Sequence, residues 1–139
     1  DSAHHPAEIA AVLQAARAGA RGRVIAVVEP HRYTRIRDLW TDFCGCFANA
    51  DSVVVGPLYT AGEQPIDGVD SEALAAGIRA MGHSAVTAID DPAALVPLLR
   101  RYARPGDMVV CMGAGVSTEW AHALPEWLAE EPRRAGNVA

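Results

Sequence analysis

The chain has 139 residues, of which 50% are hydrophobic, and a net charge of −5; this suits one globular domain with a core and disfavours nucleic acid or an anionic membrane as partner. All twelve basic residues are arginines, so the chain by itself lacks the lysine that a Walker phosphate loop or a Schiff-base enzyme requires. No apolar run approaches the ~20 residues of a membrane-spanning helix, and the first residues do not resemble a signal peptide.

The three cysteines limit the possibilities further. Cys44 and Cys46 lie two residues apart in a predicted helix and Cys111 lies in a predicted strand, so they do not suggest a disulfide framework. We expect all three to be core residues of a protein in the reducing cytoplasm.

Short apolar runs alternate with amphipathic stretches along the chain. The apolar runs predict four buried strands, and the amphipathic stretches with their capping residues predict five helices. Alternation of this kind is typical of an α/β fold with a doubly wound, mainly parallel sheet and helices on both faces. The predicted strands are 24–28, 52–55, 85–89 and 108–112, and the predicted helices begin near residues 6, 36, 71, 92 and 118.

The predicted helices have distinct apolar stripes. The second is expected to be one continuous helix that ends near Asn49, because its apolar residues follow a 3.6-residue period. The third has a stripe that includes Met81. Pro97 lies inside the fourth, where it removes a hydrogen bond unless it falls in the first turn or so. The apolar residues of the second helix are Ile36, Leu39, Trp40, Phe43 and Phe47.

The domain organisation follows from the same patterns. Residues 1–130 are predicted to form one domain, and the polar segment 131–139 a flexible tail. Segment 56–70 shows no periodicity, and a long loop inside a compact domain is usually functional or mobile.

Cationic side chains follow the first predicted strand, which a proline ends. His31, Arg32 and Arg35 lie where the carboxyl end of that strand meets a helix N-terminus, the edge at which open α/β sheets bind ligands. Because a helix N-terminus disfavours cations, two arginines three residues apart indicate an anion site. The alternative is that Arg35 forms an exposed ion pair with Asp38 or Asp42, which is worth roughly 0–1 kcal/mol.

Two further patterns are less specific. Gly113-Ala114-Gly115 follows the last predicted strand as a phosphate loop would, but a dinucleotide fingerprint has a third glycine where this chain has Thr118, and a tight turn explains the glycines equally well. His4, His5 and His31 suggest a metal site. Adjacent histidines rarely ligate one metal, however, and no carboxylate or cysteine lies at suitable spacing, so we expect no metal.

Four stretches of the chain combine into one pattern. They are Asp1-x-x-His4-His5-Pro6-x-Glu8-Ile9, Pro30-His31-Arg32-Tyr33-Thr34-Arg35, Tyr59-x-Ala61-Gly62-Glu63-x-Pro65, and Pro105-Gly106-Asp107 leading into Gly113-Ala114-Gly115. Together they resemble the C-terminal domain of the Mur ligase family, and within it the branch that joins L-alanine to UDP-N-acetylmuramate in peptidoglycan synthesis. The resemblance covers nearly the whole chain apart from its tail, and the His-Arg-Tyr-Thr-Arg run is its most specific part.

The resemblance implies an ATP-dependent, amide-bond-forming ligase of three domains. One domain binds the UDP-sugar, a central domain holds ATP and Mg²⁺ with a Walker loop, and the third, which this chain matches, closes over both. ATP phosphorylates the muramic carboxylate, and the amine of L-alanine then attacks the acyl phosphate. By position, Asp1 would contact the ATP ribose and His4 would lie near the reacting groups, while His31, Arg32 and Arg35 would hold the amino-acid carboxylate and steady developing negative charge.

Two departures from the family pattern shape the remaining expectations. Ser2 stands where the family commonly has tyrosine, and the chain begins at a motif without an initiating methionine. We therefore expect a fragment of a three-domain enzyme that does not catalyse alone. The alternative is a free-standing doubly wound module without catalysis, whose arginines bind a small carboxylate or phosphate. A Gly-Lys-Thr or Gly-Lys-Ser loop encoded upstream would favour the ligase.

The parallel sheet also predicts where the motifs meet. Because the carboxyl ends of parallel strands share one edge, the segments that follow strands should lie together there. We expect residues 1–6, 30–35, 59–63 and 113–117 to cluster at that edge.

Overall fold

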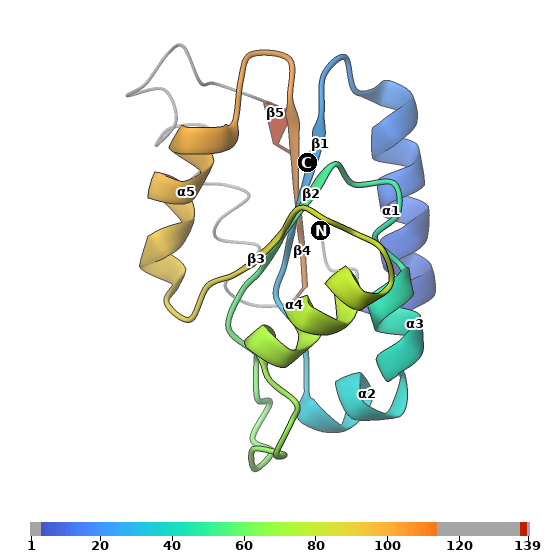
Figure 1. Cartoon of the computed structure of the whole chain (residues 1–139), viewed down its shortest axis with the longest axis vertical. Coiled ribbons are helices and arrows are strands. Elements are labelled where there is room, and N and C mark those ends of the chain that lie inside the picture. The colour runs from blue at the N-terminus through green and yellow to red at the C-terminus, as the bar shows by residue number, and fades with distance from the viewer. Residues whose placement is uncertain (1–3, 114–136, 139) are drawn as a thin grey trace.

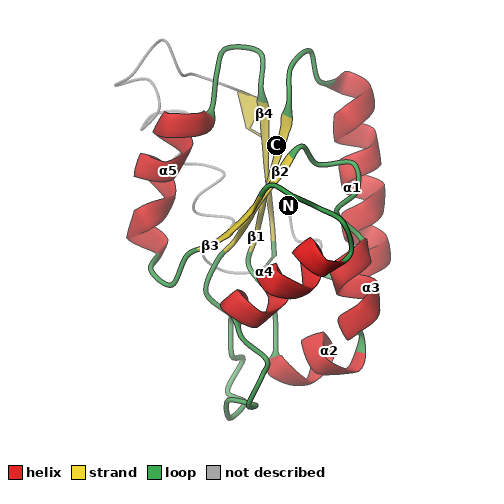
Figure 2. Ribbon diagram, in the orientation of Figure 1, coloured by secondary structure: helices red, strands yellow, loops and turns green. Residues whose placement is uncertain are grey.

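The structure, a computed structural model, describes residues 4–113 and 137–138 and follows the predicted alternation (Figures 1 and 2). No helix of this described part is long and apolar enough to cross a membrane. The elements in chain order are α1 (Pro6–Gly19), β1 (Val24–Val28), α2 (Tyr33–Asp38), α3 (Trp40–Gly45), β2 (Ser52–Val55), α4 (Ser71–Ala80), β3 (Val86–Ala88), the 3₁₀ helix η1 (Pro92–Ala94), α5 (Leu95–Tyr102), β4 (Met108–Met112) and β5 (Asn137–Val138).

The described strands form one parallel sheet in the order β3-β2-β1-β4-β5. β1 lies in the middle, and its Val28 is opposite Val55 of β2 on one side and Met112 of β4 on the other. All five residues of β1 are buried, as expected of a parallel strand covered on both faces. The predicted α/β fold with a parallel sheet is confirmed.

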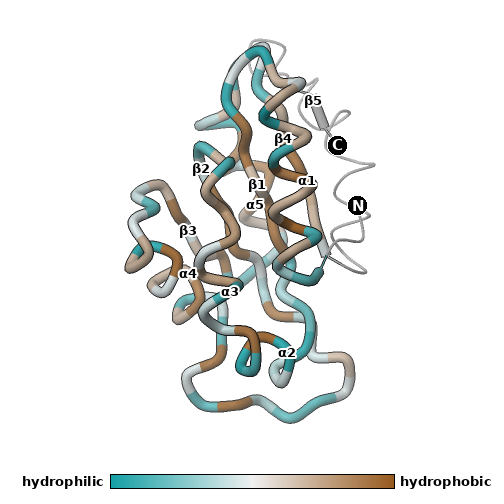
Figure 3. Tube along the Cα trace, turned by 90° about the vertical axis from the view of Figure 1, so that its right-hand side faces the viewer, coloured by the Kyte–Doolittle hydropathy of each residue, from teal (hydrophilic) through white to brown (hydrophobic). Residues whose placement is uncertain are grey.

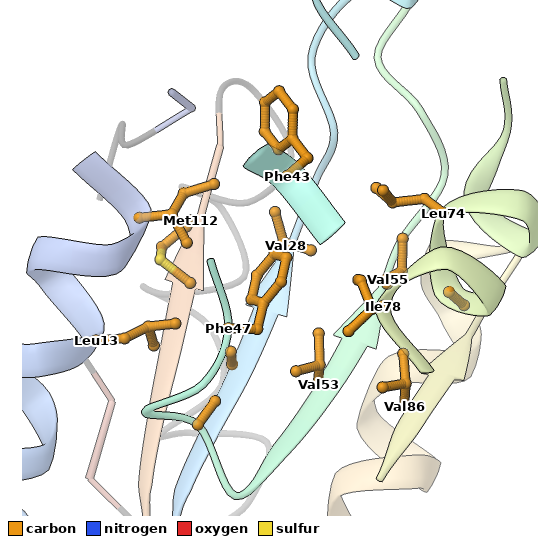
Figure 4. Close-up of a cluster of buried hydrophobic side chains, with 14 of the residues drawn as sticks. Leu13, Val28, Phe43, Phe47, Val53, Val55, Leu74, Ile78, Val86 and Met112 are labelled. Carbon is orange, nitrogen blue, oxygen red and sulfur yellow. The ribbon is translucent and has the colours of Figure 1, made fainter. Parts of the chain in front are cut away.

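The strands divide the core into two layers because their side chains alternate between the faces. The even-numbered residues of β1 belong to a cluster with α1, α3 and α4, and the odd-numbered residues belong to a cluster with α5. Figure 1 shows α1 and α5 on opposite sides of the sheet, so the sheet is doubly wound. On the first face, Phe47 lies beside Val28 (Figure 4), and each fully buried side chain of this size stabilises the fold by about 1.5–3 kcal/mol.

The prediction of one continuous second helix is wrong. Two short helices, α2 and α3, are separated by Leu39, whose backbone (φ −113°, ψ 26°) leaves the helical region. Hydrogen bonds continue across the bend, from the Leu39 N–H to the Arg35 carbonyl and from the Phe43 N–H to the Leu39 carbonyl. Ile36 and Phe43 therefore both stay buried. No proline or glycine, the usual causes of a kink, lies at the bend. The apolar period also continues across it, so neither signal predicts the bend.

Smaller differences concern the ends of elements. Met81 was predicted to belong to the buried stripe of α4, but it follows the last residue of that helix and is 57% exposed. The third strand is shorter than the predicted 85–89. Pro97 is the third residue of α5, within the first turn, where no intrahelical hydrogen bond is lost. Asn137–Val138, within the predicted tail 131–139, pair with β4 as β5. The helix predicted after β4 lies outside the described residues.

A buried carboxylate joins the amino ends of β1 and β4. The Asp107 side chain accepts hydrogen bonds from the Arg23 N–H, the Arg23 guanidinium and the Arg104 N–H, each 2.9 Å long. Gly22 must stay small, because a Cβ there would lie 2.6 Å from Asp107 Oδ1. Burial alone would raise the pKa of Asp107, but the hydrogen bonds from Arg23 and Arg104 outweigh it and lower the pKa. Asp107 thus fixes this end of the sheet.

We expect Asp107→Asn to destabilise the folded chain by about 1–3 kcal/mol, because the amide NH₂ group cannot accept the bonds that a carboxylate oxygen accepts. The lowered pKa means that the stabilisation by Asp107 is present above the ordinary aspartate pKa and is lost as the pH falls through the folded-state value. The variant should therefore lose less stability on acidification. Urea denaturation near neutral pH and in mild acid measures both effects.

Asp38→Asn is the matched control for this experiment. Asp38 pairs with Arg37 at 2.9 Å, but both side chains are more than half exposed, so the change should cost less than about 1 kcal/mol. Equal stability of the Asp107→Asn and Asp38→Asn chains would contradict the role of Asp107.

Candidate anion-binding site

The chain segments that follow β1 and β2 run side by side beyond the sheet. The Tyr59 N–H donates to the Pro30 carbonyl (2.7 Å), the Arg32 N–H donates to the Tyr59 carbonyl (2.8 Å), and His31 and Tyr59 form a parallel bridge. Figures 1 and 3 show α2 and the loop between β2 and α4 at the same end of the molecule. The predicted meeting of segments 30–35 and 59–63 is confirmed.

Two aromatic rings contact the His31 imidazole. The Tyr59 ring is stacked on it, with centroids 5.1 Å apart and planes inclined by 22°, and the His4 ring lies 5.3 Å away. His4 directly precedes the residues that start α1, so the first motif also reaches this edge. Asp1, which was expected to contact a ribose, lies outside the described residues.

Arg35 and His31 form one hydrogen-bonded unit. Arg35 Nη1 lies 3.1 Å from His31 Nδ1. A guanidinium only donates, so Nδ1 accepts and the proton of the neutral imidazole is on Nε2. Burial lowers the pKa of His31, and the charges of Arg35, His4 and Arg32 lower it further, whereas Glu63 raises it. The unit therefore presents one cation and one neutral N–H donor.

Arg32 has an unfavourable backbone conformation for a side chain of its size. Its φ is 64° and its ψ 131°, although it is not a glycine, and it is the N-cap residue of α2. Its Nε is buried and has no hydrogen-bond partner among the described residues. Strained backbone of this kind persists only where the surroundings hold it, and it is common at ligand sites.

A carboxylate from the 59–63 segment is hydrogen-bonded to the start of α2. Glu63 Oε1 accepts a hydrogen bond from the Thr34 N–H (3.1 Å), and Glu63 Oε2 accepts one from Thr34 Oγ1 (2.6 Å). The Thr34 hydroxyl and N–H, aided by the charge of Arg32, lower the pKa of Glu63. Glu63 is therefore ionised near neutral pH.

The structure does not support the surface ion pair as the explanation of Arg35. Asp38 pairs with the exposed Arg37, and within the described part of the chain Arg35 forms no ion pair with Asp38 or Asp42. The side chain of Arg35 is instead hydrogen-bonded to His31.

The turn after β4 lies beside the end of β1. The Glu29 N–H donates to the Met112 carbonyl (2.9 Å), and Gly113 follows with a φ of 133°. A Cβ at Gly113 would lie 2.7 Å from the Glu29 carbonyl oxygen, so glycine is required for this close approach. Gly113 thus reaches the same edge as His31, while the rest of the predicted 113–117 segment lies outside the described residues.

Thr34, Tyr59 and Glu63 had no separate role in the prediction, although all three belong to the motifs of the family resemblance. Their contacts with segment 30–35 join positions far apart in the chain, which spacing alone does not reveal. Within residues 4–113, no group of three His, Cys, Asp or Glu side chains could hold a metal ion.

Comparison with known proteins gives consistent matches. Residues 1–115 match the family described as Mur ligase, glutamate ligase domain. A UDP-N-acetylmuramate–L-alanine ligase from Parvibaculum lavamentivorans is 57% identical over 130 residues, which cover 94% of this chain and 26% of the relative. A ligase of the same name from Phenylobacterium zucineum is 58% identical over 125 residues, which cover 90% of this chain and 26% of the relative. The chain thus spans about a quarter of the length of these relatives.

A solved structure matches the fold over most of its length. It is a domain of a Haemophilus ducreyi protein that is provisionally named a UDP-N-acetylmuramate:L-alanyl-gamma-D-glutamyl-meso-diaminopimelate ligase. The TM-score is 0.61 at 28% sequence identity, and the match covers 89% of this chain and 84% of that one. On these matches, the chain belongs to the Mur ligase family and corresponds to its C-terminal, glutamate ligase domain.

Proposed function

We propose that the chain is the amino-acid-binding domain of an ATP-dependent ligase that joins L-alanine to UDP-N-acetylmuramate in the cytoplasm, as a step of peptidoglycan synthesis. The observation that carries the proposal is the cluster of Arg35, His31 and Arg32 at the carboxyl edge of the sheet. The names of relatives at 57–58% identity support the choice of substrates.

Each group of the cluster has a task suited to its chemistry. Arg32 and Arg35 bind the α-carboxylate of L-alanine, because a guanidinium fork matches a carboxylate with two hydrogen bonds. His31, neutral, donates its Nε2–H to the oxygen on which negative charge develops as the amine adds to the activated carboxyl carbon. His4 lies near the reacting groups through its contact with His31. Asp1 contacts the ATP ribose.

In this proposal, the chain supplies only a small part of the nucleotide site. It contains no lysine, and its described residues hold no cluster suited to a metal ion. The main contacts to the ATP phosphates and to Mg²⁺ therefore come from a Walker loop in another domain. When bound, ATP supplies the phosphoryl group that activates the muramic carboxylate as an acyl phosphate.

A ligase assay on the longer protein that contains this chain tests the proposal. Sustained ADP formation should require UDP-N-acetylmuramate, L-alanine, ATP and Mg²⁺ together, with one amide bond made per ADP, whereas without L-alanine at most one ADP should form per enzyme molecule. Reactions that omit L-alanine are the control. Binding of small carboxylates without any L-alanine-dependent ADP formation would instead support the free-standing anion-binding module.

The same assay gives a sharp prediction for Arg35. Arg35→Ala should weaken the use of L-alanine by about 2–5 kcal/mol of transition-state stabilisation, the usual scale for truncating one member of a buried charge pair. UDP-N-acetylmuramate, which is held mainly elsewhere, should be affected much less. Arg37→Ala is the control, because Arg37 lies two residues on and pairs with Asp38 on the surface. Unchanged kinetics, or a loss explained by a lower melting temperature, would contradict the assignment.

His31 gives a pH prediction. Because burial and the neighbouring Arg35 lower its pKa, His31 should titrate below 6.5 and carry its proton on Nε2 at neutral pH. ¹⁵N NMR of histidine-labelled protein measures the tautomer and the midpoint. Arg35→Gln should raise the pKa of His31, whereas Arg37→Gln should leave it unchanged. A proton on Nδ1 in the unchanged protein would rule out the hydrogen-bonded unit.

A further inference from the structure

The contact between Glu63 and Thr34 supplies a cap that α2 otherwise lacks. Thr34 is the second residue of α2, where a backbone N–H has no partner inside the helix. The N-cap residue, Arg32, makes no side-chain capping bond. Glu63, 29 residues further along the chain, satisfies the Thr34 N–H and binds its hydroxyl as well. Both carboxylate oxygens are therefore directed at the start of α2.

The same segment holds Arg32 from its other side. The Tyr59 carbonyl accepts a hydrogen bond from the Arg32 N–H at 2.8 Å. Two residues further on, Glu63 binds the Thr34 N–H, so the backbone is held both at the strained residue and just after it. A backbone with a φ of 64° costs free energy at any residue other than glycine, and it relaxes unless it is held. The direction of the Arg32 side chain depends on these two hydrogen bonds.

We propose that Glu63 is a positioning residue of the amino-acid site: by holding Thr34, it fixes the start of α2 and with it the directions of the Arg32 and Arg35 guanidinium groups. This inference rests on the proposed function and adds to it a residue that acts through α2 rather than on the ligand. The competing role for a carboxylate here is direct contact with the ammonium group of the amino acid, in which case Thr34 would be irrelevant to the effect of Glu63.

Matched variants of the longer ligase separate these roles. Glu63→Gln loses the charge and one acceptor, and Thr34→Val loses the hydroxyl but keeps the N–H. Each should lower kcat/KM for L-alanine by about 10- to 100-fold, mainly through KM, because small displacements of binding groups cost rates of this order. KM for ATP should change less than about twofold. Thr34→Ser keeps a hydroxyl and should retain most of the activity that Thr34→Val loses. Asp67→Asn is the control, because Asp67 is exposed and lies in the same loop as Glu63.

The double variant decides whether Glu63 acts through Thr34. If both residues serve one contact, Glu63→Gln combined with Thr34→Val should be no worse than the more damaging single change. Multiplied losses in the double variant would show that Glu63 acts on the ligand independently of Thr34 and would overturn the proposal. An unchanged KM for L-alanine in Glu63→Gln would overturn it too.

Melting temperatures test the positioning without any assay of activity. Arg32→Gly should melt higher than Arg32→Ala, because glycine adopts a positive φ without strain. The difference should shrink in the Glu63→Gln background if Glu63 holds the strained backbone, and an unchanged difference would contradict this. A protein without L-alanine-dependent activity would refute the proposed function, while the melting comparison would still decide the role of Glu63.

Discussion

The parallel pairing of β1 on both sides is the constraint on which the rest of the structure depends. The backbone of β1 is bonded to β2 and β4, and both of its faces are covered, so its five residues can only be small or branched apolar ones. No side chain of the strand reaches solvent. Polar side chains can therefore reach a ligand only beyond the end of the strand, and His31 lies there, directly after Pro30.

The two ends of β1 and β4 have separate tasks. At their amino ends, Asp107 binds Arg23 and Arg104 and leaves no room beyond a hydrogen at Gly22. At their carboxyl ends, Gly113 packs directly against the Glu29 backbone beside His31. The stretch from Asp107 to Gly113, which the family resemblance treats as one motif, thus joins a contact that stabilises the sheet to a turn at the ligand edge.

The sequence predicted the strands and the common edge well, because both follow from apolar runs and from parallel pairing. The apolar period also placed Ile36 and Phe43 in the core, but it could not show the bend at Leu39, where the hydrogen bonds continue through a locally altered backbone. Met81 shows the opposite failure, since it keeps the period of α4 but lies past its end.

The sequence predicted which segments meet at the site, but not the individual contacts between them. His31, Arg32 and Arg35 could be found because they break the charge preference of a helix start. The contact between Glu63 and Thr34 depends on how the loop after β2 folds back along the loop after β1. Segment 56–70 has no periodicity from which the course of its backbone could be predicted. The positive φ of Arg32 could not be foreseen either, because Arg is not a residue type that favours it.

If the proposed function holds, a carboxylate ligand meets two arginines, Arg32 and Arg35, that form no ion pair with any other described residue. Glu63 is ionised, but its oxygens are bound to Thr34, and in the described structure it forms no ion pair with Arg32 or Arg35. His31 stays neutral because burial and the two arginines oppose a third positive charge. The positive charges of Arg32 and Arg35 both act on His31, and the negative charge of Glu63 acts on it in the opposite direction. In the proposed function, a bound carboxylate offsets these charges, and no ion pair between described residues has to be broken first.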